Sequence, residues 1–182
     1  MSNERFEGLA DGFLVLEARG GDREAFRLLT ERWQERLWRQ ARRVTRREDL
    51  AWDATQETWL AIVGSLEHLQ DPARFGAWAL SIVTRRALDV LRRGSRLEPL
   101  PESGEPVLQE GPNPGDERLE RMRDAIDSLP AEQRALLSLH HAEGVALEDI
   151  AEHLAVPLGT VKSRLHTARE RLRAIVERKH HA

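Results

Sequence analysis

Residues 147–172 read LEDIAEHLAVPLGTVKSRLHTARERL, and this stretch decides the fold class of the chain. Apolar residues recur at steps of three and four on both sides of a short break, which is the period of an amphipathic helix. The break at residues 155–159 contains a proline and a glycine, which end one helix before another begins. The stretch therefore predicts two helices, one over 147–154 and a longer one from Thr160, joined by a tight turn.

Two helices joined in this way form a helix-turn-helix, whose second helix can enter the major groove of DNA. On a helical wheel, one side of the second helix is an apolar stripe of Val161, Leu165, Ala168 and Leu172. The other side carries Lys162, Ser163, His166, Thr167 and Arg173, flanked by Arg164, Arg169 and Arg171. Side chains near the helix start reach base edges, and arginines suit phosphates. The pattern favours DNA binding over the alternative of a solvated basic surface helix.

The rest of the chain also predicts helices. Apolar residues at helical spacing mark segments 25–37, 52–66, 78–91 and 119–129, and Pro130 suits the first turn of the next helix. In the second segment the stripe consists of Trp52, Trp59, Ile62, Val63 and Leu66. No segment alternates convincingly with a period of two, so we predict an all-α fold without a sheet.

Composition limits the class of protein. The chain has 182 residues, 40% of them hydrophobic and 32% charged, which allows one ordinary domain or two small ones. It lacks Cys, which excludes disulfides and cysteine nucleophiles. No apolar run reaches the roughly 20 residues of a membrane span, and the N-terminus lacks a signal-peptide pattern. We expect a cytoplasmic protein that does not insert into a membrane.

An enzyme is the first rival interpretation. His140-His141 and Glu152-His153 suggest a metal site, but the H-E-x-x-H spacing is absent, as are a P-loop and a dinucleotide-binding turn. These histidines are predicted to be surface groups. We therefore expect no catalytic residue, no metal and no cofactor.

Charge is segregated along the chain, although the net charge is only −3. Three runs are basic: 32–47, 85–96 and 160–179. Residues 97–120 are acidic and rich in Pro and Gly, with almost no periodic apolar residues. This composition predicts a flexible linker at 97–117 between a first domain at 1–96 and a second at 118–182.

Two blocks of sequence resemble a known family. In the C-terminal half, segments 127–134 (DSLPAEQR), 148–152 (EDIAE) and 159–172 (GTVKSRLHTARERL) resemble region 4 of bacterial RNA polymerase sigma factors. In the N-terminal half, segments 21–28 (GDREAFRL), 53–60 (DATQETWL) and 75–78 (FGAW), followed by Ile82, Asp89 and 91–93 (LRR), resemble region 2. The closest group is the compact extracytoplasmic-function (ECF) type. The segments that resemble region 4 are also similar to the helix-turn-helix of one-component regulators. The N-terminal block therefore decides between a sigma factor and such a regulator, and it favours the sigma factor.

The resemblance implies a factor that binds core RNA polymerase, recognises promoter DNA and promotes strand opening. It implies that region 2 docks on the clamp of the largest subunit and that region 4 meets the flap of the second largest. The residues it implies for the clamp are Asp53, Gln56 and Glu57. Trp52 stands where the family usually has a small or charged residue, and is either buried in this domain or an aromatic anchor of the interface.

The resemblance also implies the DNA contacts. Those expected at the minus-ten element are Gln70, Asp71, Arg74, Trp78, Arg85, Arg86, Arg92 and Arg93, with Trp78 either stacked on a base or packed in the core. Those expected at the minus-thirty-five element are Thr160, Lys162, Ser163, Arg164, His166, Thr167 and Arg169. Three departures from the family stand out: Arg85 replaces a common Asn, Thr167 replaces a frequent Arg, and Ala146 replaces a capping Ser or Thr. The last of these costs on the order of 1 kcal/mol.

Two further expectations concern regulation. The resemblance implies an anti-sigma factor as a partner. The acidic linker either threads the positively charged cleft of the polymerase or is an inert tether.

Overall fold

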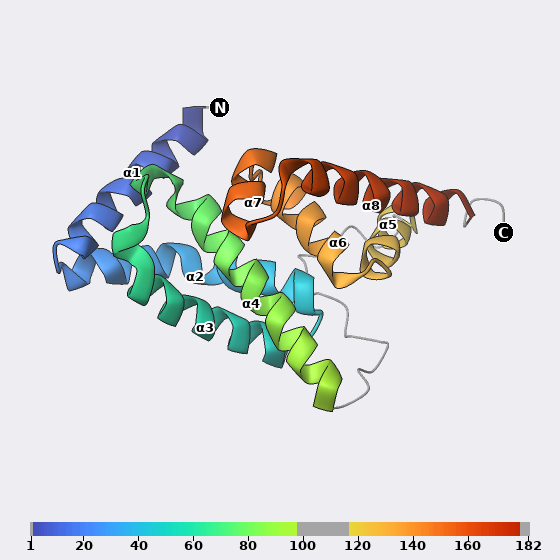
Figure 1. The fold of residues 1–182 in the computed structure, drawn as a ribbon, viewed down its shortest axis with the longest axis horizontal. Coiled ribbons are helices and arrows are strands. Elements are labelled where there is room, and N and C mark those ends of the chain that lie inside the picture. The colour runs from blue at the N-terminus through green and yellow to red at the C-terminus, as the bar shows by residue number, and fades with distance from the viewer. Residues whose placement is uncertain (1, 98–116, 179–182) are drawn as a thin grey trace. The chain divides into compact units, whose positions relative to one another are not determined.

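The computed structural model describes residues 2–97 and 117–178, and within these ranges every regular element is helical (Figure 1). The all-α prediction is confirmed. The chain divides into two compact units, Met1–Leu100 and Pro101–Ala182. The predicted linker lies outside the described residues, apart from its two end positions, Leu97 and Glu117.

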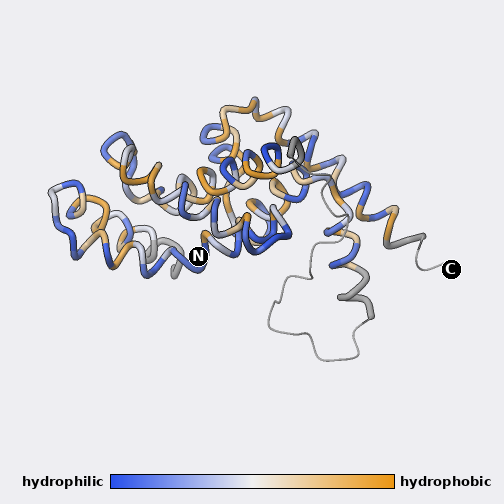
Figure 2. Tube along the Cα trace, turned by 90° about the horizontal axis from the view of Figure 1, so that it is seen from below, coloured by the Kyte–Doolittle hydropathy of each residue, from blue (hydrophilic) through white to orange (hydrophobic). Residues whose placement is uncertain are grey.

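Unit 1 is built on three mutually packed helices. These are α2 (Arg23–Thr45), α3 (Glu48–Ser65) and α4 (Phe75–Leu97), and α1 (Ser2–Arg19) packs on α2 and on the segment between α3 and α4. That segment contains two short 3-10 turns, η1 (Leu66–His68) and η2 (Pro72–Arg74). The fully buried side chains include Leu29, Leu37, Ile62, Phe75, Leu80 and Val83. Apolar and polar residues alternate along the helices, as expected of helices with one buried face (Figure 2).

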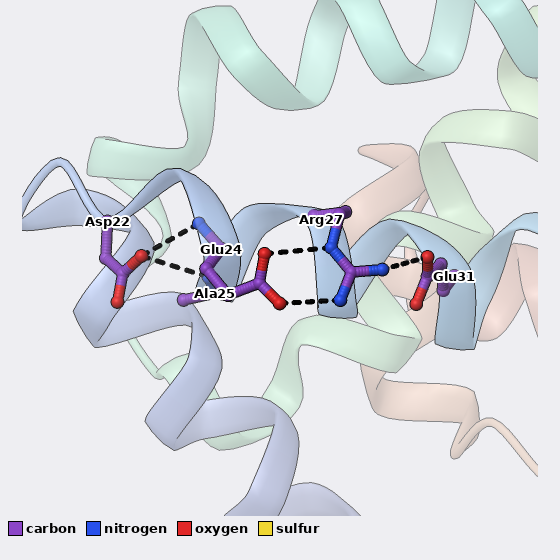
Figure 3. A network of polar contacts seen from close by, with 5 residues as sticks. All are labelled: Asp22, Glu24, Ala25, Arg27 and Glu31. Carbon is purple, nitrogen blue, oxygen red and sulfur yellow. Dashed lines mark hydrogen bonds and ion pairs between the residues drawn. The ribbon is translucent and has the colours of Figure 1, made fainter.

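The start of α2 explains the motif at residues 21–28. Gly21 has a φ of +94°, which a residue without a Cβ adopts readily, and Asp22 then caps the helix. Asp22 Oδ1 accepts from the backbone N–H groups of Glu24 (2.8 Å) and Ala25 (3.3 Å) (Figure 3). Arg27 bridges Glu24 and Glu31 on the helix surface, and its hydrogen bond holds the pKa of Glu24 below the ordinary value.

The helix predicted from the apolar stripe at 52–66 is present as α3, but two residues of that stripe are exposed. The helix buries Ala51, Ala54, Thr55, Thr58 and Ile62, while Val63 is 63% exposed and Trp52 is 41% exposed. Thr55 and Thr58 are tolerated inside because their hydroxyls donate to the carbonyls of Ala51 and Ala54, both at 2.7 Å. Small residues therefore face the core of unit 1, and several large apolar ones face outward.

Unit 2 is arranged around its last helix. The helices α5 (Glu117–Asp127), α6 (Ala131–Leu137) and α7 (Leu147–Leu154) all pack on α8 (Leu158–Arg178). A π-helical turn, η3 (Ser138–Ala142), extends α6, with the Glu143 N–H bonded to the Ser138 carbonyl at 3.0 Å. The core of the unit contains Leu139, Ile150, Val161, Leu165 and Ala168.

The turn of the helix-turn-helix consists of residues 155–157, so α8 begins two residues earlier than Thr160, the predicted start. The carbonyl of Pro157 accepts from the N–H groups of Thr160 (2.8 Å) and Val161 (3.1 Å), which starts the helix at once. Ala155 ends α7 in the left-handed region, with a φ of +54°. Ala146 is the N-cap of α7 and makes no side-chain cap bond, so the predicted missing cap is confirmed.

Arg134, from the segment that resembles region 4, is a buried structural residue. Its guanidinium Nη1 donates to the carbonyl of Leu129 at 2.8 Å and to that of Asp127 at 3.2 Å. These carbonyls lie at the end of α5 and in the turn after it, where backbone acceptors lack helical partners. Arg134 therefore fixes the connection between α5 and α6.

Candidate polymerase and nucleic-acid interfaces

The outward face of α8 carries the predicted base readers. Lys162, Ser163, His166 and Thr167 are all exposed. Ser163 Oγ donates to the Thr160 carbonyl and Thr167 Oγ1 donates to the Ser163 carbonyl, both at 3.0 Å. The structure thus brings these four side chains together on one face of one helix, in its first three turns.

The arginines that flank this face are held by polar contacts within unit 2. Each one reaches a side chain of α6 or η3. The pairs are Arg164 Nη1 with Glu132 Oε2 at 3.5 Å, Arg169 Nη2 with His141 Nε2 at 3.0 Å, and Arg171 Nη1 with Gln133 Oε1 at 3.3 Å. Such surface contacts are worth little and exchange readily for a phosphate. They place the three arginines beside the exposed face of α8.

His141 is tied to this cluster by its protonation state. Because arginine can only donate, Nε2 of His141 accepts from Arg169 and must be unprotonated. Partial burial of the ring, the neighbouring His140 and the charge of Arg169 hold the pKa of His141 below its ordinary value. His140 in turn lies 3.0 Å from the Val145 carbonyl through Nδ1.

In unit 1, the segment between α3 and α4 presents two of the predicted minus-ten residues. Gln70 and Asp71 are exposed, and Arg74 is half-buried. Asp71 also has a structural task, because its Oδ1 accepts from the N–H of Ala73 at 3.0 Å and caps η2. The Gln70 side chain therefore projects from a turn that Asp71 closes.

Trp78 lies at the edge of the core of unit 1. It is half-buried, and its ring centroid is 5.9 Å from that of the fully buried Phe75. Phe75 packs edge-on against Trp33, with ring centroids 5.7 Å apart. One part of the Trp78 ring is thus packed, and the remainder faces outward.

The predicted arginines of α4 follow this segment along the chain. Arg85, Arg92 and Arg93 are exposed, and Arg86 is half-buried. Arg93 Nη2 lies 2.6 Å from Glu57 Oε1, and Arg86 Nη1 lies 4.0 Å from Glu57 Oε2. Glu57 on α3 is therefore shared between two residues of α4.

The outward face of α3 holds the predicted polymerase contacts. Asp53 and Gln56 are exposed, and the Trp52 ring packs against Trp38 at a centroid distance of 5.7 Å. Sequence reasoning missed two residues on this side, Leu60 and Val63, which are 75% and 63% exposed. Residues 52, 56, 60 and 63 share one side of the helix, because steps of three and four align along it. A signal for this arrangement was present in the sequence. The helical positions that face the core are occupied by four small residues, Ala51, Ala54, Thr55 and Thr58, so that Leu60 and Val63 lie on the other side.

The first basic run, at 32–47, combines the buried Arg42 with arginines that are half-buried or exposed on unit 1. Most of its arginines have intradomain partners. Arg32 Nε pairs with the buried Asp11 at 2.8 Å, Arg36 lies 4.7 Å above the Trp33 ring, Arg39 pairs with Glu35 at 3.7 Å, Arg42 is buried, and Arg47 pairs with Asp49 at 2.5 Å. Charge counting alone does not distinguish these structural arginines from a binding surface.

Within the described ranges, 2–97 and 117–178, the chain has neither a metal-binding cluster nor a membrane-spanning helix. No cluster of three or more His, Asp or Glu there could hold a metal ion. No helix in these ranges has both the length and the apolar character to cross a membrane.

Comparison with known proteins identifies the chain. Residues 29–97 match the family Sigma-70 region 2, and residues 119–172 match Sigma-70, region 4. The chain is 40% identical over 152 residues to the ECF RNA polymerase sigma factor SigE of Mycolicibacterium smegmatis, covering 80% of this chain and 59% of that protein. It is 33% identical over 178 residues to the ECF RNA polymerase sigma-E factor of Haemophilus influenzae, covering 90% of this chain and 94% of the relative.

Solved structures show the same fold. CnrH, in complex with the cytosolic domain of CnrY, has a TM-score of 0.65 and 26% identity, over 92% of this chain and 97% of the other. The sigma factor RpoE from Bartonella quintana, in complex with the anti-sigma factor NepR, has a TM-score of 0.67 and 22% identity, over 84% and 96%. The latter likeness concerns the fold alone.

The chain therefore belongs to the sigma-70 family of transcription initiation factors. Within that family it is a member of the ECF group of RNA polymerase sigma factors, which act in promoter recognition and transcription initiation. Members of this family are initiation factors rather than enzymes.

Proposed function

We propose that the two units divide promoter recognition between them, and that three separate exposed faces carry the contacts. The observation that supports this proposal is their chemical difference. The face of α3 is apolar and acidic, the segment before α4 is polar with arginines after it, and the face of α8 is basic with hydroxyl groups. In this proposal the first domain spans 1–96, the linker 97–117 and the second domain 118–182.

The face of α3 binds core polymerase. Asp53, Gln56 and Glu57 supply polar contacts to the clamp of the largest subunit, and Trp52 is an aromatic anchor. Exposed aromatic residues that become buried on binding contribute most of the free energy in many interfaces. Leu60 and Val63 extend the apolar part of this face by two turns.

The segment at 70–74 and α4 bind the non-template strand at the minus-ten element. Gln70, Asp71 and Arg74 surround an unstacked base, whose capture offsets an unstacking cost of a few kcal/mol without ATP. The outer part of the Trp78 ring offers a stacking surface. Arg85, Arg86, Arg92 and Arg93 lie along α4, where they neutralise phosphates of the opened strand.

The face of α8 binds the minus-thirty-five element. Lys162, Ser163, His166 and Thr167 read base edges in the major groove. Thr160, Arg164 and Arg169 hold the adjacent phosphates. Unit 2 also meets the flap of the second-largest polymerase subunit.

An anti-sigma factor is proposed as a further partner. The proteins CnrH and RpoE were each solved with a bound partner, CnrY and the anti-sigma factor NepR respectively. Such a partner would keep the factor from the polymerase. The chain is proposed to act in the cytoplasm, where polymerase and promoters are found.

Run-off transcription with purified core polymerase and genomic fragments tests the proposal. We expect discrete start sites preceded by two shared elements at a constant spacing. The matched control is core polymerase without the chain. Tight binding of the chain alone to a duplex operator, without any stimulation of core polymerase, would instead indicate a one-component regulator.

A further inference from the structure

The segment that joins α3 to α4 is bound to α1 by side-chain hydrogen bonds. Arg19, in the last turn of α1, donates from Nε to the carbonyl of Leu66 at 3.0 Å and from Nη2 to the carbonyl of Leu69. The Leu66 carbonyl lies at the first residue of η1, and the Leu69 carbonyl follows η1 and directly precedes Gln70. One guanidinium thus fixes the backbone on the N-terminal side of the exposed turn, and the buried side chains of Leu66 and Leu69 anchor it from below.

The backbone of α1 also lies directly against η2, on the other side of the exposed turn. A Cβ at Gly12 would lie 3.2 Å from the backbone nitrogen of Ala73, and one at Gly8 would lie 3.1 Å from its carbonyl oxygen. Both distances are closer than ordinary van der Waals contact. The neighbour in each case is backbone, which cannot rotate away as a side chain can. The two glycines therefore permit a close approach that any larger residue would push apart.

Gln70 and Asp71 thus project from a short segment whose two ends rest on the same helix. Arg19 holds residues 66 and 69, and the glycine face of α1 seats residue 73. Asp71 closes the turn between them through its bond to the N–H of Ala73. A recognition loop that is ordered before it binds loses less conformational entropy on binding.

We propose that α1 preorganises the minus-ten loop, with Arg19 as its positioning residue and Gly8 and Gly12 as its seat. This inference rests on the proposed function, in which Gln70, Asp71 and Arg74 contact the opened strand. Arg19 touches no DNA in this proposal. It acts through the carbonyls of Leu66 and Leu69.

The test uses the full chain assembled with core polymerase on a promoter mapped by run-off transcription. Strand opening is followed by the fluorescence of a 2-aminopurine in the minus-ten element. We expect Arg19→Met to slow opening about tenfold, the factor expected when one or two interface groups must be ordered on binding. Binding of core polymerase and of a minus-thirty-five duplex remains unchanged. Glu17→Gln, an exposed change on the same helix, is the matched control.

Sequence selectivity distinguishes positioning from general destabilisation. The readout is the ratio of opening rates on the matched promoter and on one with a substituted minus-ten base. A variant that merely lowers the folded fraction slows both promoters equally and leaves the ratio unchanged. We expect Arg19→Met to bring the ratio toward one. Arg19→Lys keeps a single donor group, and its ratio should lie between those of the parent chain and Arg19→Met. An unchanged ratio in a folded Arg19→Met protein overturns the proposal.

A double-mutant cycle with Gln70→Ala tests the route of the effect. If Arg19 acts through the loop, adding Arg19→Met to Gln70→Ala costs much less than Arg19→Met alone. Fully additive effects contradict the proposal. If Gln70→Ala and Asp71→Ala are both without effect on opening, the proposed function of the loop fails, and this inference fails with it. An effect of Gln70→Ala without one of Arg19→Met rejects only the role of α1.

Gly12→Ala supplies an independent variant. We expect it to lower the selectivity ratio in the same direction, because the added methyl group displaces Ala73. Gly64→Ala is the control for helix propensity, since a Cβ at Gly64 meets nothing within 4 Å. Equal selectivity ratios for the two glycine variants would contradict the seating of η2 on α1.

Discussion

Glu57 on α3 and Arg93 on α4 form an ion pair across unit 1, with 2.6 Å between Oε1 and Nη2. The pair joins a residue proposed to bind polymerase to one proposed to bind the opened strand. Arg86, at 4.0 Å, completes the group. If both proposed contacts are made, binding of Glu57 to the polymerase and binding of Arg93 to DNA are therefore coupled.

Glu57→Gln removes the charge that holds the two arginines. We expect the isolated chain to bind a single-stranded minus-ten oligonucleotide up to about fivefold more tightly, since a surface pair is worth at most about 1 kcal/mol. Affinity for core polymerase falls in the same variant. Fluorescence anisotropy at two salt concentrations measures the first effect. Glu48→Gln, an exposed acid at the start of α3, is the control, and an equal gain in both variants would refute the link.

Trp52→Ala tests the aromatic anchor on α3. We expect core affinity to fall by about 2 kcal/mol, the loss typical of an interface hot spot, while the chain stays folded. The lost contact with Trp38 lowers the free energy of unfolding by about 1 kcal/mol. Leu28→Ala is a suitable control, because Leu28 on α2 is apolar and 40% exposed, much like Trp52. Unchanged affinity for core polymerase in Trp52→Ala would reject the anchor.

Ala146 and Ala155, the residues at the two ends of α7, are each less stabilising than another residue would be, for different reasons. Ala155→Gly relieves a left-handed conformation, and we expect unit 2 to gain about 0.5–1 kcal/mol of stability. Ala146→Ser adds the missing cap and gains about 1 kcal/mol. Urea denaturation of the full chain measures both. Ala174→Gly, within α8, is the opposite control and costs up to about 1 kcal/mol; a loss of stability in Ala155→Gly would contradict the assigned turn.

His141 makes the stability of unit 2 depend on pH. Its pKa is lower in the folded chain than the ordinary value of 6.5, so below that pH the unfolded chain binds more protons. The contribution is therefore complete above about pH 6.5 and is lost as the pH falls through the folded pKa. We expect His141→Gln to remove this part of the slope in urea titrations between pH 5 and 8. His166→Gln, which leaves the His141–Arg169 contact in place, is the control; the same slope in His141→Gln and the parent chain would contradict the assignment.

The sequence predicted the helical class and the buried and exposed sides of α8 because both depend on local period. Val161, Leu165 and Ala168 are buried as their spacing required. The face of α3 was predicted less well, since large apolar residues usually face a core, whereas here Leu60 and Val63 face outward. The spacing of apolar residues identifies the apolar side of a helix, but it does not show whether that side contacts the core of the domain or another protein.

Other features depended on contacts between distant segments, which period does not report. Helix α1 was not predicted, because Gly8 and Gly12 within it weaken the helix signal. Both glycines are explained by the close approach of the Ala73 backbone in η2. The role of Arg134 as a cap on α5 was equally hidden. The arginines of residues 32–47 gave a strong charge signal, yet many of them have structural partners, including the buried Asp11.

The hydroxyls of Ser163 and Thr167 each have their one proton committed to a carbonyl of α8. A hydroxyl in that state presents only lone pairs to a ligand. In the major groove, lone pairs complement the exocyclic amino groups of adenine and cytosine and are mismatched with the acceptor edge of guanine. If Ser163 and Thr167 read base edges as proposed, these two positions favour a base that offers an amino group.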